Sequence, residues 1–430
     1  MRTSKEMPCH IGLHVKLYPS NEQKHIIAVN DGAQRSVYNH LVAAGNERFR
    51  LRQAAKYVPA YRDHLRYLQD TASSTAGMKT ALPYLNEANV DSATVDNAFR
   101  NYRFAWKNMK DNHRGVPAFH KKSAEQSYQT NSHYKSGDTG IFDGSIRFDG
   151  MSHLILPKIG KIRIGASPKL LQELLVHPTD RRITTVTVQR DAVGEYWCSI
   201  AIASETPFRM QLPKTGTMAG IDLNILELVN QSDGVSFENR KFYKEAEPHL
   251  AKEQHDLSRK QARALRENRS LLSSKNYQKQ RTKVAFINRK IARRRDDYLN
   301  RVSRNLIENQ DLIAAENLQV RNMLKNHKLA KAIQDCGWRK LLTLLQEKAA
   351  TYGKECILVP PQYTTQTCSA CGHKLTGDQM IPLSVRDWTC PACGKYHLRD
   401  TNAAQNILNK ALAKRMTAWA DISWHGNSPG

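Results

Sequence analysis

The spacing of apolar residues changes twice in the N-terminal half of the chain. Residues 11–17 alternate apolar and polar side chains and lead to Ser20, which predicts a β-strand followed by the N-cap of a helix. The apolar positions then follow the longer period of helices. Beyond residue 115, short β-type runs return at 145–150, 153–164 and 184–190. We therefore expect a β-rich, barrel-like domain of residues 1–20 and 116–210 that carries a helical insertion at 21–115.

After a linker at 206–216, the pattern becomes that of an α/β domain. Its expected elements are a hairpin turning at Asp233 and Gly234, a helical segment at 240–301, strands at 311–318 and 356–362, and helices at 337–353 and 400–415. Strand, helix and strand in this order predict parallel pairing. We expect this domain at 215–366 and 395–415, interrupted by a separate segment at 367–394 and followed by a flexible tail at 416–430.

The net positive charge of the chain predicts a negatively charged partner. The sequence holds 65 Lys and Arg against 40 Asp and Glu, a net charge of +25. Such an excess favours a polyanion, whose phosphates it would neutralise with release of counterions. Residues 240–301 alone hold 19 Lys and Arg against 7 Asp and Glu. A single arginine there is better explained as part of a solvated helix face, but the concentrated stripe, with Arg293, Arg294 and Arg295, predicts a nucleic-acid surface.

Apolar runs and cysteines indicate the compartment. No run approaches the roughly 18 to 20 apolar residues of a membrane span, and the first residues lack the apolar stretch of a secretory signal. We expect an intracellular, cytoplasmic protein with no membrane partner. In that compartment the eight cysteines are expected to be metal ligands and buried thiols rather than disulfides.

Four of these cysteines have the spacing of a zinc ribbon. Cys368 and Cys371 form one CxxC pair, Cys390 and Cys393 form another, and 18 residues separate the pairs. A glycine follows each pair, which favours a tight turn whose backbone amides donate to the thiolates. Four thiolates leave no open position on the metal, so we expect one structural Zn²⁺. A redox-active CxxC is the alternative.

Three carboxylates form the second candidate site, because each stands at the end of an expected core element. They are Asp222 in GIDLN, Glu316 in AAENL and Asp400 in RDTNAAQN. Taken singly, they could be a strand-end cap, a surface acid and a helix N-cap. Taken together, they are the oxygen ligands that Mg²⁺ or Mn²⁺ prefers, and two such ions can catalyse phosphodiester hydrolysis.

A resemblance to a known family rests on the segments TTQTCSACGHKL (364–375) and LSVRDWTCPACGKYHLRDTNAAQNIL (383–408). They resemble the C-terminal signature of TnpB proteins, which are transposon-encoded RNA-guided DNA endonucleases of prokaryotes, and of compact type V CRISPR effectors. KLYPSNEQ, LPKIGKIRI and DCGWRKLL extend the resemblance over most of the chain. It implies an α/β RNase H-like (RuvC) nuclease core that carries the three acids and is interrupted by the ribbon. It also implies a wedge domain with a helical recognition insertion, a guide RNA as partner, and cleavage of target DNA, double- or single-stranded, beside a short motif.

The chain departs from the family pattern at Asn224, Asn317 and Leu398, none of which removes a metal ligand. Nuclease-inactive relatives lose one or more of the three acids, so we expect an active enzyme. A nuclease-inactive RNA-guided DNA-binding repressor and a CRISPR-associated type V effector stay open as alternatives. The guide RNA, the target-adjacent motif and the oligomeric state cannot be predicted from the sequence.

Overall fold

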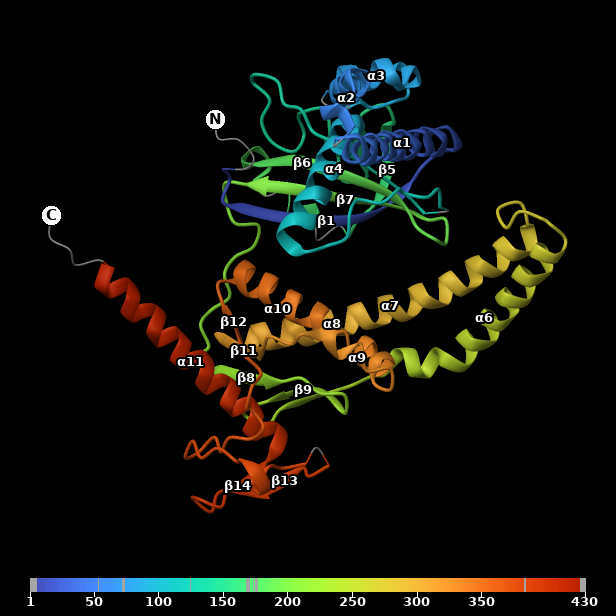
Figure 1. Ribbon diagram of the computed structural model, residues 1–430. Coiled ribbons are helices and arrows are strands. Elements are labelled where there is room, and N and C mark those ends of the chain that lie inside the picture. The colour runs from blue at the N-terminus through green and yellow to red at the C-terminus, as the bar shows by residue number, and fades with distance from the viewer. Residues whose placement is uncertain are drawn as a thin grey trace. The chain divides into compact units, whose positions relative to one another are not determined.

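The computed structural model describes residues 6–425 apart from 53, 72–73, 124, 168–170, 173, 175–176 and 383. The chain forms two compact units, Met1–Phe208 and Arg209–Gly430, and they divide within the linker expected at 206–216 (Figure 1). Among the described residues, no helix combines the length and the apolar character that a membrane span requires.

The first unit is built on one antiparallel sheet of seven strands. In chain order these are β1 (Cys9–Tyr18), β2 (Gln126–Asn131), β3 (Arg147–Asp149), β4 (His153–Leu156), β5 (Gly160–Gly165), β6 (Arg181–Arg190) and β7 (Tyr196–Ser204). Their order in the sheet is β2-β6-β7-β1-β5-β4-β3. Alternate side chains of β1 point into the core, as the sequence predicts: Leu13, Val15 and Leu17 are buried with Val186 and Ile200 of the neighbouring strands.

Hydrogen bonds join the segments that flank the two end strands of this sheet. Ser132 follows β2 and Ile146 precedes β3, and the Ser132 hydroxyl donates to the Ile146 carbonyl over 3.2 Å. The Ser145 amide donates to the His133 carbonyl at 2.9 Å. The segments that flank β2 and β3 are therefore joined, although the strands themselves each pair with one neighbour in the described residues.

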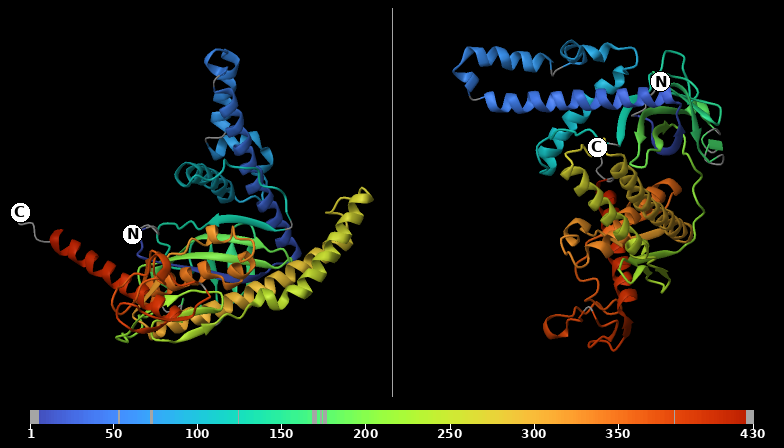
Figure 2. Two further views of the ribbon diagram at one scale, coloured as in Figure 1. Left: turned by 60° about the horizontal axis from the view of Figure 1, so that its bottom comes forward. Right: turned by 90° about the vertical axis from the view of Figure 1, so that its right-hand side faces the viewer.

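In the described residues between β1 and β2, where a helical insertion is expected, there are four α-helices. They are α1 (Asn21–Leu51), α2 (Pro59–Thr71), α3 (Thr75–Ala81) and α4 (Ser92–Asn112), with α2 and α3 running back along α1 in Figure 2. Ser20 and Gln23 form a capping box at the start of α1. Val37 and Leu41 of α1 pack against Val95 and Phe99 of α4 in a small core of their own.

The second unit has a mixed sheet in the order β10-β9-β8-β11-β12. The strands are β8 (Met218–Asp222), β9 (Glu227–Gln231), β10 (Ser236–Glu238), β11 (Leu312–Glu316) and β12 (Glu355–Val359). β8, β11 and β12 are parallel, as the strand–helix–strand order predicts, whereas β9 and β10 are antiparallel. The expected turn at Asp233 and Gly234 joins β9 to β10, with Gly234 at a φ of +89°.

Helices cover both faces of this sheet. α7 (Lys275–Asn309) and α10 (Trp338–Tyr352) pack on the face of Ile313 and Ala315, while α11 (Arg399–His425) packs on the face of Leu312 and Ala314. Because helices cover both faces of β11, its residues 312–315 are all apolar. Short helices α8 (Val320–Met323) and α9 (Ala330–Cys336) lie between β11 and α10.

The basic segment forms a long helical hairpin of α6 (Phe242–Arg266) and α7, seen side by side in Figures 1 and 2. The sequence predicts the buried face of α7 correctly: Ile291, Val302 and Leu306 are all buried. The last helix is longer than predicted. α11 continues to His425, although we expected a flexible tail from 416, and residues 426–430 of that tail lie outside the described residues.

Candidate metal centres

The four ribbon cysteines come together as the CxxC spacing predicts. Their sulfur atoms all lie within 4.8 Å of one another, with Cys368 and Cys393 at 3.7 Å and Cys371 and Cys390 also at 3.7 Å. A tetrahedral site with Zn–S bonds of about 2.3 Å has sulfur–sulfur edges of about 3.8 Å. The donor set therefore fits Zn²⁺. In the described part of the chain, no other group of three or more Cys, His, Asp or Glu side chains is gathered so tightly.

The two knuckles owe their shape to the glycines after each CxxC pair. Gly372 and Gly394 have φ values of +76° and +69°, where a side chain would be strained. Each glycine amide donates to the carbonyl of the first cysteine of its pair, at 2.9 Å in both cases. The expected tight turns are present, and strands β13 (Asp387–Thr389) and β14 (Tyr396–Leu398) pair beside them.

A histidine that the sequence reasoning did not single out lies against the ribbon sulfurs. The Nε2 atom of buried His397 is 3.1 Å from the Cys368 sulfur, and its ring packs on Trp388 with centroids 4.9 Å apart. Burial, and then the charge of Lys395, lower the pKa of His397. The neutral ring can still donate an N–H to a Cys368 thiolate, which is the kind of outer contact that stabilises a metal-bound sulfur.

The three predicted acids converge at one end of the second sheet. Asp222 ends β8 and Glu316 ends β11, and because these strands are parallel neighbours both side chains lie at the same edge. Asp400 stands in the first turn of α11, which packs across β8. Gly220 permits this approach, because a Cβ there would fall on the carbonyl oxygen of Ala404 in α11. The close contact between the backbones of Gly220 and Ala404 therefore places Asp400 near Asp222 and Glu316.

The electrostatics of Asp222 reveal how close these acids are. Its side chain is 8% exposed, and burial, followed by the charges of Glu316 and Asp400, raises the pKa of Asp222 to about 7. Burial also raises the pKa of Glu316. A buried carboxylate beside two further carboxylates is stabilised by a divalent cation, which offsets their negative charge. The donor set fits Mg²⁺ or Mn²⁺, although the three acids are less tightly gathered than the thiolates.

Hydrogen bonds hold two of the three carboxylates in place. The Thr364 hydroxyl donates to Glu316 Oε1 at 2.6 Å, and the Asn224 amide nitrogen donates to Asp400 Oδ2 at 3.0 Å. Asn224 is one of the departures from the family pattern, and in this structure it contacts a candidate ligand directly. Thr364 gave no signal in the sequence, because its partner is 48 residues away in the chain.

Two buried asparagines of α11 connect the acid site to the ribbon. Asn406 donates to the carbonyls of Thr364 and Thr367 at 2.8 and 2.6 Å. Asn402 donates to the Thr367 carbonyl and accepts from the Ser369 amide, both at 2.8 Å. The spacing of the two asparagines by four residues in DTNAAQN was the available signal, since it places both on one helix face.

The three consecutive arginines of α7 do not form one exposed row. Arg293 and Arg294 are exposed, and Arg294 pairs with Glu245 at 3.1 Å. Arg295 is 24% exposed, donates to the Gln334 carbonyl at 3.2 Å and lies 4.0 Å from Asp335. The first two remain candidates for nucleic-acid contacts, whereas Arg295 also connects α7 to α9.

Three family profiles match successive parts of the chain. Residues 7–53 match "Helix-turn-helix domain", 199–327 match "Probable transposase", and 338–407 match "Cas12f1-like, TNB domain". In this structure the first matched range is strand β1 followed by the single long helix α1. The last covers α10, β12, the ribbon and the start of α11, and so includes Asp400.

A relative that aligns over nearly the whole chain decides the family. A Streptomyces pristinaespiralis protein described as "Putative RNA-guided DNA endonuclease" is 33% identical over 401 residues, which are 93% of this chain and 88% of the relative. The chain belongs to the TnpB family. The Escherichia coli (strain K12) protein InsQ, with the same description, is 27% identical over 91% of this TnpB chain and 90% of its own length. Mimivirus proteins named TnpB-like are 33% identical over 152 residues.

The TnpB chain is also similar to a chain of a solved complex. A Cas12f1–sgRNA–target DNA complex contains a chain that is 15% identical, with a TM-score of 0.49 over 93% of this chain and 99% of that one.

Proposed function

We propose that this TnpB chain is an RNA-guided DNA endonuclease, and that Asp222, Glu316 and Asp400 bind its catalytic metal ions. One observation carries the proposal. In a chain 33% identical to a protein described as an RNA-guided DNA endonuclease, three acids from distant segments lie at one end of a sheet, where burial and then the charges of Glu316 and Asp400 raise the pKa of Asp222. Such a set is unfavourable to folding on its own, and metal binding is the chemistry that offsets it.

Each residue of the site has a distinct task in this proposal. Asp222 lies deepest and is the ligand whose charge is most strongly coupled to the other two. Thr364 orients Glu316, and Asn224 orients Asp400, so that their oxygens face the same space. Arg399, buried beside Asp400, lowers the pKa of Asp222 through its charge and so favours the ionised, ligating form. When bound, two divalent ions would supply Lewis-acid stabilisation of the attacking and leaving oxygens of a phosphodiester.

The finer architecture is part of the same proposal. We assign an RNase H-like (RuvC) core to residues 215–366 and 395–415 and a zinc ribbon to 367–394, with one structural Zn²⁺ on Cys368, Cys371, Cys390 and Cys393. The wedge domain is residues 1–20 and 116–210, and the helical recognition insertion is 21–115. The mixed sheet with its acids, the tetrahedral fit of the sulfurs and the helices between β1 and β2 support these assignments.

The partners in this proposal are a guide RNA and its DNA target. The net charge of +25 and the basic hairpin of α6 and α7 supply the positive surface that both need. Target choice would lie in base pairing with the guide and in a short motif beside the target, because a backbone-binding surface carries no sequence information.

The test is to produce the protein together with the DNA that flanks its gene, and to sequence the RNA that co-purifies. We expect one discrete RNA species and, once its variable end is rewritten, cleavage of a matching plasmid in Mg²⁺. Replacing the matched target with a scrambled one provides the control. A preparation that carries no discrete RNA, or that cuts both plasmids alike, would reject guided cleavage.

A further inference from the structure

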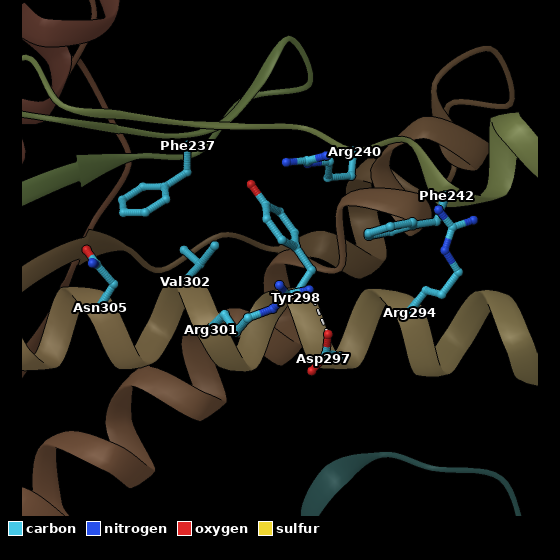
Figure 3. Close-up of a pocket in the computed structure, with 9 residues that line it drawn as sticks. All are labelled: Phe237, Arg240, Phe242, Arg294, Asp297, Tyr298, Arg301, Val302 and Asn305. Atoms are coloured by element: carbon cyan, nitrogen blue, oxygen red, sulfur yellow. Dashed lines mark hydrogen bonds and ion pairs between the residues drawn. The ribbon is translucent and has the colours of Figure 1, made fainter.

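A hollow of about 470 Å³ lies on the second unit, where β10 and the start of α6 face α7 (Figure 3). It belongs to neither metal centre. Three aromatic rings and three guanidinium groups line it: those of Phe237, Phe242, Tyr298, Arg240, Arg294 and Arg301. In Figure 3 the Tyr298 ring rises from α7 and stands between the rings of Phe237 and Phe242, with Arg240 above it. The hollow therefore combines flat apolar surfaces with cations at its rim.

Two of the rings, those of Tyr298 and Phe242, are held in position before any ligand arrives. The Tyr298 hydroxyl donates to the Glu238 carbonyl of β10 at 2.6 Å, and its ring meets Phe242 edge to face with centroids 6.0 Å apart. Arg294 lies over the Phe242 ring, 4.9 Å from its centroid. A ring fixed from both ends offers a stacking surface without the entropy cost of ordering it on binding.

The arginines are held by weak, exchangeable partners. Arg301 pairs with Asp297 at 2.7 Å, Arg294 with Glu245 at 3.1 Å and Arg240 with Glu238 at 3.3 Å. All three side chains are about half exposed or more, and ion pairs this exposed contribute only about 0–1 kcal/mol. A phosphate can displace such carboxylates. The lining itself keeps an excess of positive charge, because Asp297 is its one acid against three arginines.

We propose that this hollow binds one unpaired nucleotide of a single-stranded nucleic acid, with the base packed against Tyr298 and Phe237 and the neighbouring phosphate on the arginines. The combination of aromatic platforms and a cationic rim is how proteins hold single strands, whereas the bases of a duplex are stacked on one another and cannot reach a ring. The volume lies within the range of roughly 300–1,000 Å³ typical of small-ligand pockets. The inference deepens the proposed function, on which it rests for the presence of a nucleic-acid partner.

The first experiment compares single strands with duplexes in the full-length protein. Tyr298→Leu removes the ring, Arg301→Gln removes an exposed rim charge, and Lys290→Gln removes a charge from the same helix outside the hollow. The probes are a fluorescein-labelled 12-nucleotide strand, as RNA and as DNA, and the matching DNA duplex, each followed by anisotropy at several salt concentrations.

We expect Tyr298→Leu to weaken single-strand binding about tenfold and duplex binding less than twofold, since stacking acts on unpaired bases alone. Arg301→Gln should flatten the single-strand salt dependence by about one counterion, and it keeps the test valid if Tyr298→Leu does not fold. Lys290→Gln should affect single strands and duplex equally. Equal losses on single strand and duplex in the hollow variants, or no loss at all, would overturn the proposal.

The second experiment identifies which strand supplies the nucleotide. With 5-iodouracil placed in the co-purified RNA, or in either strand of its DNA target, irradiation should crosslink the peptide that contains Tyr298. A crosslink from RNA assigns the guide, one from DNA assigns an unwound target strand, and none from either contradicts the hollow. The two proposals can fail independently. If the hollow variants keep wild-type single-strand affinity, the hollow proposal fails while guided cleavage can still occur. If the protein carries no guide RNA, the proposed function fails while the hollow can still bind single strands.

Discussion

The four cysteines of the ribbon all lie within residues 367–394. The three carboxylates of the acid site lie on β8, β11 and α11, which are separated by most of the second unit's chain. The ribbon ligands are fixed by local turns at Gly372 and Gly394. The acids are fixed by the sheet register, by the packing of α11 on Gly220, and by Thr364 and Asn224. The first site is local in sequence, and the second depends on the tertiary fold.

This difference has an energetic side. Thiolates that gather around zinc gain ligation energy, which in such modules is folding energy. At the acid site, burial and then the charges of Glu316 and Asp400 raise the pKa of Asp222, so its ionised form is unfavourable there when no cation is bound. We therefore expect the ribbon to stabilise the fold and the acid site to weaken it when no metal ion is bound. The asparagines of α11 connect the two, so a change at one site should be measurable at the other.

The largest expected effect comes from removing one carboxylate of the acid site. Asp222→Ala, Glu316→Ala or Asp400→Ala should each reduce guided cleavage by about a thousandfold or more, because several kcal/mol of barrier stabilisation depend on the bound ions. Guided DNA binding should stay within about threefold of wild type, since none of these side chains belongs to the basic surface. Cleavage rates and gel-shift affinities measured on the same preparations check both halves.

Asp233→Ala provides the matched control, because Asp233 is an exposed acid in the hairpin turn of the same sheet. It should cut like wild type. If any one of the three acid variants kept near wild-type cleavage with the rewritten guide, that residue would not be a metal ligand.

The next largest effect is expected from removing one cysteine ligand of the ribbon. Cys390→Ser should lower bound zinc from about one ion per chain toward zero and expose residues 367–394 to proteolysis, because thiolate ligation is coupled to folding of the module. Cys9→Ser, which changes a thiol outside the ribbon, should keep its zinc. Metal analysis and limited proteolysis give the readout, and full zinc occupancy in Cys390→Ser would rule out this ligand set.

The two sites also differ in how much of them the sequence could predict. The CxxC spacing predicts all four sulfur ligands, because the turn of each pair is local. The strand ends in GIDLN and AAENL predict Asp222 and Glu316 as candidates, while the pairing of β8 with β11 that brings them to one sheet edge is long-range. The residues that position the ligands were not predicted. Thr364 and His397 act on side chains far along the chain, and only the folded backbone brings them into contact.

The same distinction between local and long-range features applies to the fold. The periodicities of β1, β11, α7 and α10 predict these elements and their buried faces, since each pattern repeats within one element. The hollow of Figure 3 had no signal, because Phe237 and Tyr298 come from different elements. The length of α11 was underestimated, although residues 416–425 contain no glycine or proline that would end a helix before Gly426.

A smaller effect tests the connection between the sites. Asn406→Ala removes two donors to the carbonyls of Thr364 and Thr367, which should cost about 1–3 kcal/mol of stability because buried acceptors lose their partner. Thr364 would then hold Glu316 less firmly, so half-maximal cleavage should need several times more Mg²⁺. Asn409→Ala, at an exposed position of the same helix, is the control. A loss of stability with an unchanged Mg²⁺ requirement would limit Asn406 to a structural contribution.

The smallest effect concerns pH and the repulsion at the acid site in protein that retains zinc but is free of Mg²⁺ and Mn²⁺. Burial and the neighbouring carboxylates raise the pKa of Asp222 from 3.8 to about 7, so the folded state binds a proton that the unfolded state releases. The stabilisation from this proton is complete below about pH 4 and is lost as the pH rises through 7. Asp222→Asn stays neutral and does not lose this stabilisation, so the variant should melt a few degrees above wild type at pH 8, with a smaller difference toward pH 5.

Added Mg²⁺ should stabilise wild type and leave Asp222→Asn nearly unchanged, because the variant lacks one of the ligands. A melting difference that is the same at pH 5 and pH 8 would mean that the pKa of Asp222 is not raised in the folded protein.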